Sequence, residues 1–304
     1  MRLVRIASFH LAAPALAHDP SSRAVVDRTG RAPEPRAMFV LPLLLTFLPQ
    51  SFPTAKGSLV IVGGGSIPEE IPKRALALAG GPDAKVLVVP QASAQPDAGS
   101  SSVEMWRRAG ATSVSILDLA DPAAALAAVR AARLIWMGGG DQNRLVHALA
   151  ETEVPSAIRT RHAEGAVVGG TSAGAAAMSK AMITGEADLE SVTGGATEVV
   201  EGLGLWPEVI VDQHFLKRRR FNRLLGAVLD RSDLLGVGID EGTAVFVSGR
   251  SFEVVGRGNA VVVDARDAVS VRAERGRPSS GAKLAVHVLV DGMRFDLDRG
   301  LLPK

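Results

Sequence analysis

Short runs of β-branched residues alternate with amphipathic stretches from Ser58 onward. This alternation is typical of parallel strands that are joined by crossover helices. The pattern predicts strands at 58–62, 85–90, 113–117, 133–137 and 166–169, and helices that begin near Pro68, Ser101, Asp121, Asp141 and Pro155. Because the predicted strands are continuous apolar runs, they are expected to be buried on both faces. The sequence therefore predicts an α/β fold with a doubly wound, mostly parallel sheet and helices on both faces.

The pattern changes after about residue 232, where short strands follow one another with turn residues and no helix between them. The segments LLGVGID, TAVFV, FEVVG and AVVV predict an antiparallel edge of the same sheet or an adjoining small sheet. Further on, AVHVLVDGMRFDL predicts a hairpin with Asp291 and Gly292 at its turn. We therefore expect an α/β domain at 56–265 and a short antiparallel C-terminal β extension at 266–304.

Residues 1–55 have the features of a leader. MFVLPLLLTFL at 38–48 is an apolar run of the length found in secretory signal peptides, and SFPTA at 51–55 offers a cleavage site. The run is shorter than the roughly 20 apolar residues that a transmembrane helix needs. We expect a signal peptide at 38–55 and export to the periplasm or beyond, without a stable membrane anchor. Translation starts at Met1 or Met38, and the alternative is a leader whose apolar helix packs on the core.

Composition narrows the classes of function. The formal net charge is only +2, from 34 basic and 32 acidic residues, so we expect no nucleic-acid partner. The chain has no cysteine, which excludes thiol catalysis, cysteine-ligated metal sites and disulfides. Any function that depends on positive charge must therefore come from a local cluster.

The most informative local pattern is Gly170-Thr-Ser-Ala-Gly174, which lies between a predicted strand and a run of small helix formers. It fits the G-x-S-x-G nucleophile elbow, in which small neighbours allow a strained turn that exposes the serine. The amide of Ala173 could then stabilise an oxyanion. The alternative is a glycine-rich turn in which Ser172 caps a helix.

A catalytic serine requires a base, and His214 is the best placed of the six histidines. It follows the predicted strand WPEVIV, so it is expected at the edge of the sheet where open α/β folds build their sites. His147, His162 and His287 fall within amphipathic patterns that favour packing or surface roles, and His10 and His18 lie in the leader.

Charged residues surround the expected position of His214. Just after it, KRRRFNR at 217–223 places arginines that can bind carboxylates in a cleft, although a solvated face is the alternative. Asp240 and Glu241 end another hydrophobic strand, and either acid could orient the histidine in a Ser-His-acid triad.

Two glycine-rich segments also end predicted strands. Met137-Gly-Gly-Gly-Asp-Gln142 offers backbone amides for a second oxyanion donor and a glutamine for substrate, and a phosphate loop is the alternative. Gly63-Gly64-Gly65 resembles a dinucleotide-binding loop, but Pro68 stands where the third glycine of G-x-G-x-x-G is needed. Nucleotide binding is therefore disfavoured.

Taken together, GGGDQ, GGTSAGA, DQHFxxRxRxxRL and GIDEGTA resemble the cyanophycinase family of serine peptidases, peptidase family S51, over residues 57–265. The resemblance implies a fold related to class I glutamine amidotransferases and requires no metal or cofactor. It implies Ser172 as nucleophile, His214 as general base and Glu241 as its acidic partner, with Gly139 and the Ala173 amide as the oxyanion hole. The positions that match the family's substrate pocket are Gln142, Asp212, Gln213, Arg218, Arg220 and Arg223.

The resemblance implies a peptide-like substrate, cyanophycin, which has a poly-aspartate backbone with arginine joined to each β-carboxyl group. Arginines of the chain could hold a carboxylate of this polymer, and an acid such as Asp212 could bind its guanidinium. We expect an acyl-enzyme mechanism that releases β-Asp-Arg dipeptides. The alternatives are an aspartyl dipeptidase of the same family and a binding protein without turnover. A homodimer is plausible by the same resemblance.

Overall fold

The computed structural model describes residues 55–303. The predicted signal peptide and both candidate start sites, Met1 and Met38, therefore lie outside the described residues. Within the described part of the chain, no helix combines the length and the apolarity that crossing a membrane requires.

A nine-stranded sheet forms the centre of the fold, in the order β17-β16-β11-β10-β1-β5-β4-β2-β3. The parallel half consists of β1 (Ser58–Val62), β2 (Lys85–Val89), β3 (Ser113–Ile116), β4 (Leu134–Met137) and β5 (Val167–Thr171). Strands β10 (Thr243–Ser248), β11 (Ser251–Gly256), β16 (Arg294–Asp296) and β17 (Gly300–Leu302) extend it with antiparallel pairings. The predicted mostly parallel α/β fold is confirmed.

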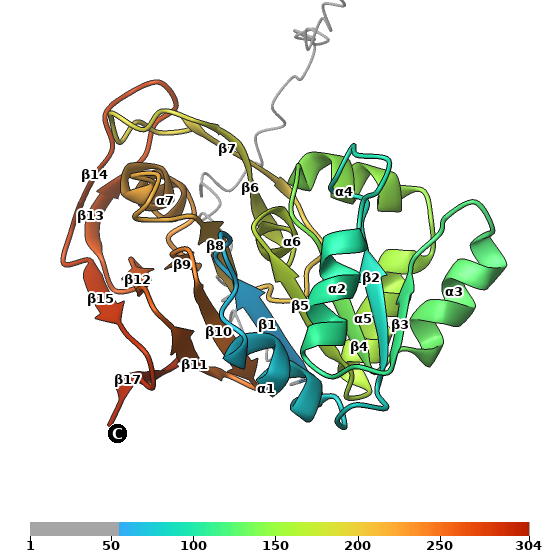
Figure 1. Cartoon of the computed structure of the whole chain (residues 1–304). Helices are drawn as coiled ribbons and strands as arrows, with labels where there is room; N and C mark the ends of the chain where they lie inside the picture. Colours follow the sequence, from blue (N-terminus) through green and yellow to red (C-terminus); the bar gives the residue numbers. More distant parts are fainter. Residues whose placement is uncertain (1–54, 304) are drawn as a thin grey trace, which may run out of the picture. The chain divides into compact units, whose positions relative to one another are not determined.

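Helices cover both faces of this sheet (Figure 1). Val60 and Val62 share one core with α1 (Glu70–Leu78) and α2 (Ser100–Arg108). Leu59 and Ile61 point the other way, because side chains alternate along a strand. They share a core with α3 (Pro122–Ala131), α4 (Gln142–Ala150), α5 (Val154–Ala163) and α6 (Ala173–Ala176).

A second sheet packs into the same core as α3–α6. It contains β8 (Val209–Gln213), β9 (Leu235–Ile239), β12 (Ala260–Asp264) and β15 (Ala285–Leu289), in the order β15-β12-β9-β8. Helix α7 (Phe221–Asp230) lies beside this sheet (Figure 1). Its apolar residues Leu224, Ala227 and Val228 share a core with residues of β8 and β12. Two small ribbons pair β6 (Ala181–Ala187) with β7 (Thr197–Glu201), and β13 (Val269–Arg272) with β14 (Ser280–Ala282).

The predicted hairpin around Asp291 and Gly292 is wrong in its pairing. The turn itself forms, with Gly292 at a φ of 76°. However, β15 pairs with β12 of the second sheet, and β16 pairs with β11 of the first. The two strands separate because each buries an apolar side chain, Leu289 or Phe295, by extending a different sheet. Strands beyond residue 265 therefore pair directly with the α/β core.

Candidate active site

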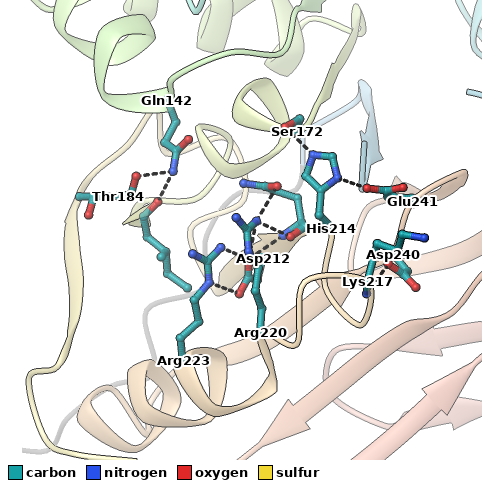
Figure 2. A network of polar contacts seen from close by, with 12 residues as sticks. Gln142, Ser172, Thr184, Asp212, His214, Lys217, Arg220, Arg223, Asp240 and Glu241 are labelled. Carbon is teal, nitrogen blue, oxygen red and sulfur yellow. Dashed lines mark hydrogen bonds and ion pairs between the residues drawn. The ribbon is translucent and has the colours of Figure 1, made fainter. Parts of the chain in front are cut away.

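The carboxyl ends of three strands bring together a serine, a histidine and a glutamate (Figure 2). Ser172 follows β5, His214 follows β8 and Glu241 follows β9. Ser172 Oγ lies 2.9 Å from Nε2 of His214, and Nδ1 of the same ring lies 2.7 Å from a carboxylate oxygen of Glu241. If Nδ1 carries the ring proton, Nε2 is free to accept the proton of the serine hydroxyl. This is the geometry of a Ser-His-acid triad.

Ser172 occupies a strained backbone conformation, with φ 52° and ψ −112°. Its glycine neighbours make this turn possible. A Cβ on Gly170 would lie 2.7 Å from the carbonyl carbon of Gly174, and one on Gly174 would lie 2.7 Å from that of Met137. Any larger residue would push the turn away from β4. Both glycines of the G-x-S-x-G pattern are therefore required by close backbone packing.

Of the two candidate acids, Glu241 faces the histidine. The Asp240 carboxylate instead accepts a hydrogen bond from the backbone amide of Lys217, at 3.1 Å. The hydrogen bond from His214 is the largest of the effects that lower the pKa of Glu241. Burial lowers the pKa of His214 and outweighs the opposing hydrogen bond from Glu241. The imidazole is therefore neutral at neutral pH, as a general base must be.

Two backbone amides beside Ser172 are available to a ligand. Within residues 55–303, the amides of Gly139 and Ala173 donate to no acceptor. A Cβ on Gly139 would lie 3.5 Å from Cβ of Ser172, which places this glycine against the serine. Gly174 donates to the Gly138 carbonyl at 3.1 Å and so ties the loop to the elbow. The arrangement offers two donors near the serine hydroxyl, as an oxyanion hole requires.

Comparison with known proteins agrees with this geometry. The family model of peptidase family S51 matches residues 59–255, which include all three triad residues. This chain belongs to peptidase family S51. Family S51 enzymes are serine-type peptidases, so the protein is an enzyme of this class.

Several curated relatives of this S51 peptidase bear the name cyanophycinase. The protein of Synechococcus elongatus is 40% identical over 230 residues, which cover 72% of this chain and 71% of the relative. The protein of Geminocystis herdmanii is 38% identical over 79% of this chain and 94% of its own length. The protein of Trichormus variabilis is 35% identical over 92% of this chain and 96% of its own length.

Two solved structures share the fold. A peptidase from an acI-B1 actinobacterium superposes with a TM-score of 0.56 at 23% identity, covering 79% of this chain and 96% of that structure. A putative peptidase E from Listeria monocytogenes superposes with a TM-score of 0.50 at 17% identity, covering 67% of this chain and all of that structure. At these identities the similarity concerns the fold alone.

The loop Gly63-Gly64-Gly65 supports the S51 triad, a role that the sequence pattern did not reveal. The carbonyls of Val62, Gly63 and Gly64 accept hydrogen bonds from the amides of Ser172, His214 and Gly242, at 3.1, 2.7 and 2.9 Å. A Cβ on Gly64 would lie 2.5 Å from Nε2 of His214, and one on Gly65 would lie 3.0 Å from a carboxylate oxygen of Glu241. The histidine and glutamate side chains thus fill the space over the loop. This finding rules out the dinucleotide-loop alternative for this segment.

The predicted role of Asp212 in binding a substrate guanidinium needs correction. Its carboxylate is 1% exposed and pairs with the guanidinium of Arg223, whose Nε lies 2.7 Å from Oδ2. Arg223 is itself only 2% exposed, so it does not reach a substrate either. A buried charge is stable only when it is paired. The structure therefore assigns Asp212 and Arg223 to each other (Figure 2).

The other predicted pocket residues differ in accessibility. Gln213 is buried, and Arg220 donates to its side-chain oxygen at 2.8 Å and to its backbone carbonyl at 2.7 Å. Gln142 is also buried, and its side-chain nitrogen donates to the carbonyls of β6 residues Ile183 and Thr184. Arg218 is exposed, and among the described residues it forms no ion pair. Of the three predicted pocket arginines, Arg218 is thus exposed, Arg220 half-buried and Arg223 buried.

Arg220 keeps its charge despite partial burial. Burial and the neighbouring Arg223 lower the pKa of Arg220 to about 10, so the guanidinium stays protonated at neutral pH. Arg220 and Arg223 share the single carboxylate of Asp212, which lies 3.9 Å from Arg220. This group therefore has a net positive charge, which favours binding of an anion next to His214.

Burial is the main cause of the lowered pKa of His214, and the charge of Arg218 contributes to it. Arg218 lowers the pKa of His214, so Arg218→Gln raises it. Because the histidine acts in its neutral form, the acid limb of the kcat/KM profile moves to higher pH in the variant. The kcat/KM profile, measured from about pH 4 to 9 at low salt, reports the pKa of His214 in the free enzyme.

The neighbouring arginine provides the control for this prediction. Arg219 is exposed like Arg218 but does not contribute to the shift at His214. Arg219→Gln is therefore expected to leave the midpoint of the acid limb of the kcat/KM profile unchanged. An unchanged midpoint in Arg218→Gln would contradict the electrostatic coupling.

Proposed function

We propose that this S51 peptidase is a cyanophycinase, which hydrolyses the polymer of β-aspartyl-arginine units to β-Asp-Arg dipeptides. The observation that carries the proposal is the hydrogen-bonded set Ser172, His214 and Glu241 beside a group with net positive charge. Each unit of the polymer presents the carboxylate of its arginine, which is a fitting ligand for such a group. The similarity to proteins named cyanophycinase supports the same substrate.

The triad performs the reaction in two stages. His214 Nε2 takes the hydroxyl proton as Ser172 Oγ attacks the acyl carbon of a backbone amide between two aspartyl units. The amides of Gly139 and Ala173 donate to the oxyanion that forms. The histidine then gives its proton to the leaving nitrogen, and the C–N bond breaks. In the second stage a water attacks the acyl carbon as His214 takes its proton; the ester bond to Ser172 then breaks, and the histidine returns the proton to Oγ. The isopeptide bond to arginine stays intact.

Arg218 and Arg220 position the polymer in this mechanism. Planar guanidinium groups bind carboxylates with two parallel hydrogen bonds, which fixes both distance and orientation. Arg220 is held by two hydrogen bonds to Gln213, so its guanidinium is already placed before substrate arrives. Binding in this way directs the acyl carbon toward Ser172 and reduces the entropy lost in the transition state.

The test is the product released from purified cyanophycin by residues 56–304. We expect β-Asp-Arg dipeptides, identified by mass spectrometry, and no free arginine, because the isopeptide bond is not cut. Free arginine without dipeptide would place the scissile bond elsewhere and contradict the proposed mechanism. Cleavage of Asp-X dipeptides with no action on the polymer would show an aspartyl dipeptidase. Binding of the polymer without any product would show a protein without turnover.

Export and self-association are part of the same proposal. The apolar run at 38–48 and the small residues at 51–55 support secretion with cleavage near Ala55. N-terminal sequencing of the protein from the periplasm or the medium tests this, and an uncleaved protein in the cytosol would contradict it. Resemblance to the family favours a homodimer, which light scattering of the purified protein tests.

A further inference from the structure

The pairing of Asp212 with Arg223 leaves one requirement of the proposed substrate unmet. Each polymer unit carries a guanidinium as well as a carboxylate, and a bound guanidinium needs an anionic or hydroxyl partner. Asp212 is occupied by Arg223, and the carboxylate of Glu241 is bound to His214. A partner for the substrate guanidinium must therefore come from another part of the site.

A pocket that is bordered by Gly139, beside the nucleophile, has suitable chemistry. It has a volume of about 190 Å³ and lies between the loop that follows β2 and the glycines Gly138 and Gly139. Its polar side chains are Ser93, Gln95, Asp97, Ser101 and Ser102, and its lining contains no lysine or arginine. Within residues 55–303 the Asp97 carboxylate has no ion pair. The pocket thus offers one carboxylate without an ion pair, on the exposed residue Asp97, together with three serine residues in its lining.

The pocket also lies at the right place for a side chain next to the scissile bond. Gly139 borders the pocket and lies directly against Ser172, since a Cβ on this glycine would be 3.5 Å from Cβ of the serine. A carbonyl oxygen held by the Gly139 amide would therefore sit at the mouth of the pocket. A flexible side chain on the same unit could enter it without moving the acyl carbon from Ser172.

We propose that this pocket is the subsite for the arginine side chain of the substrate, with Asp97 binding its guanidinium. The inference rests on the proposed function. It means that two regions of opposite charge lie near Ser172: Arg218 and Arg220 near His214, and Asp97 in the pocket that Gly139 borders. A polymer unit with one carboxylate and one guanidinium then fits in a single orientation. Asp97 is a specificity-determining residue, because it contacts the side chain and not the reacting atoms.

The test compares two synthetic substrates of equal shape. One is a short (β-Asp-Arg) oligomer, and the other replaces arginine with citrulline, which is nearly isosteric but uncharged. We expect Asp97→Asn to lower kcat/KM for the arginine oligomer about tenfold, as for the loss of one charged hydrogen bond in a half-open site. The citrulline oligomer should be cleaved equally by both proteins. Glu104→Gln, an exposed acid on α2 outside the pocket, is the matched control and should change neither rate.

Other results of this experiment would contradict either the subsite at Asp97 or the proposed function itself. If Asp97→Asn lowers both rates equally, the residue has a structural role and the subsite is wrong. Glu186 is an exposed acid two residues after Thr184 on β6. If Glu186→Gln, and not Asp97→Asn, loses the preference for the arginine oligomer over the citrulline oligomer, the guanidinium binds beside β6 and the proposed subsite is wrong. If the wild-type protein cleaves neither oligomer nor cyanophycin, the proposed function fails and the subsite fails with it.

Discussion

Ser172→Ala is expected to abolish peptidase activity while leaving the fold intact. In triads of this kind, loss of the nucleophile lowers kcat by on the order of 10⁶-fold, because the general base then has no nucleophile to activate. Ser172 Oγ hydrogen-bonds His214 and nothing else within the described residues, so its removal breaks no structural contact. Alanine keeps the Cβ of the elbow, and its backbone strain is no greater than that of serine. Release of dipeptide from cyanophycin, followed by mass spectrometry, gives the activity.

Two measurements make this prediction specific to the nucleophile. The thermal unfolding midpoint of Ser172→Ala should match that of the parent, which separates lost chemistry from lost structure. Ser113→Ala changes an exposed serine at the amino end of the edge strand β3 and should retain full activity. A fluorophosphonate that reacts with active-site serines should label the parent and Ser113→Ala, but not Ser172→Ala. Turnover by Ser172→Ala above background would place the nucleophile on another residue.

The positions of the strands and of the triad residues followed from local features of the sequence. Buried parallel strands are continuous apolar runs, and β1 begins and ends where such a run does. Ser172 is predictable from the G-x-S-x-G pattern between a strand and a helix, and His214 from its position after a strand, at the edge where open α/β sheets build their sites. The choice between Asp240 and Glu241 could not be made from local sequence features. Both follow β9, and only the direction of each side chain decides which one meets the ring.

The pairing of Asp212 with Arg223 was hidden from the sequence for a related reason. The two residues lie on β8 and α7, and a charged residue at a strand end has the same local pattern whether it faces a partner or a ligand. Burial decides between the two cases, and burial depends on how α7 packs on the second sheet. An acid and an arginine eleven positions apart, each within an apolar segment, are the signal that could have suggested an internal pair.

The supporting role of Gly63, Gly64 and Gly65 depends on contacts between distant segments. Gly64 and His214 are neighbours only because β1 and β8 belong to sheets that pack on each other. The sequence pattern resembles a dinucleotide-binding loop, in which glycines expose their amides to phosphate, and only Pro68 disfavours that interpretation. In this fold the same glycines are needed because side chains of other segments occupy the space beside their Cα atoms.

Gly64→Ala is therefore expected to lower kcat by about 10³-fold, with KM little changed. The new Cβ would lie 2.5 Å from Nε2 of His214, so the ring must leave the position in which it meets Ser172. A misplaced general base loses much of the catalysis that the triad provides. The proposed substrate contacts at Arg218, Arg220 and Asp97 are left unchanged by this substitution, so kcat should fall more than KM rises. The two constants are obtained from initial rates on a (β-Asp-Arg) oligomer.

Gly80→Ala separates the contact with His214 from the cost of the backbone conformation. Gly80 has a φ of 113°, close to the 102° of Gly64, but a Cβ there would meet nothing within 4 Å. Both variants should therefore lose roughly 1–2 kcal/mol of stability from a residue with a side chain at positive φ, and Gly64→Ala should lose more because its Cβ also meets His214. Only Gly64→Ala should lose activity. Equal kcat values in the two variants would show that the loop does not position His214, and that the triad is held by its own hydrogen bonds alone.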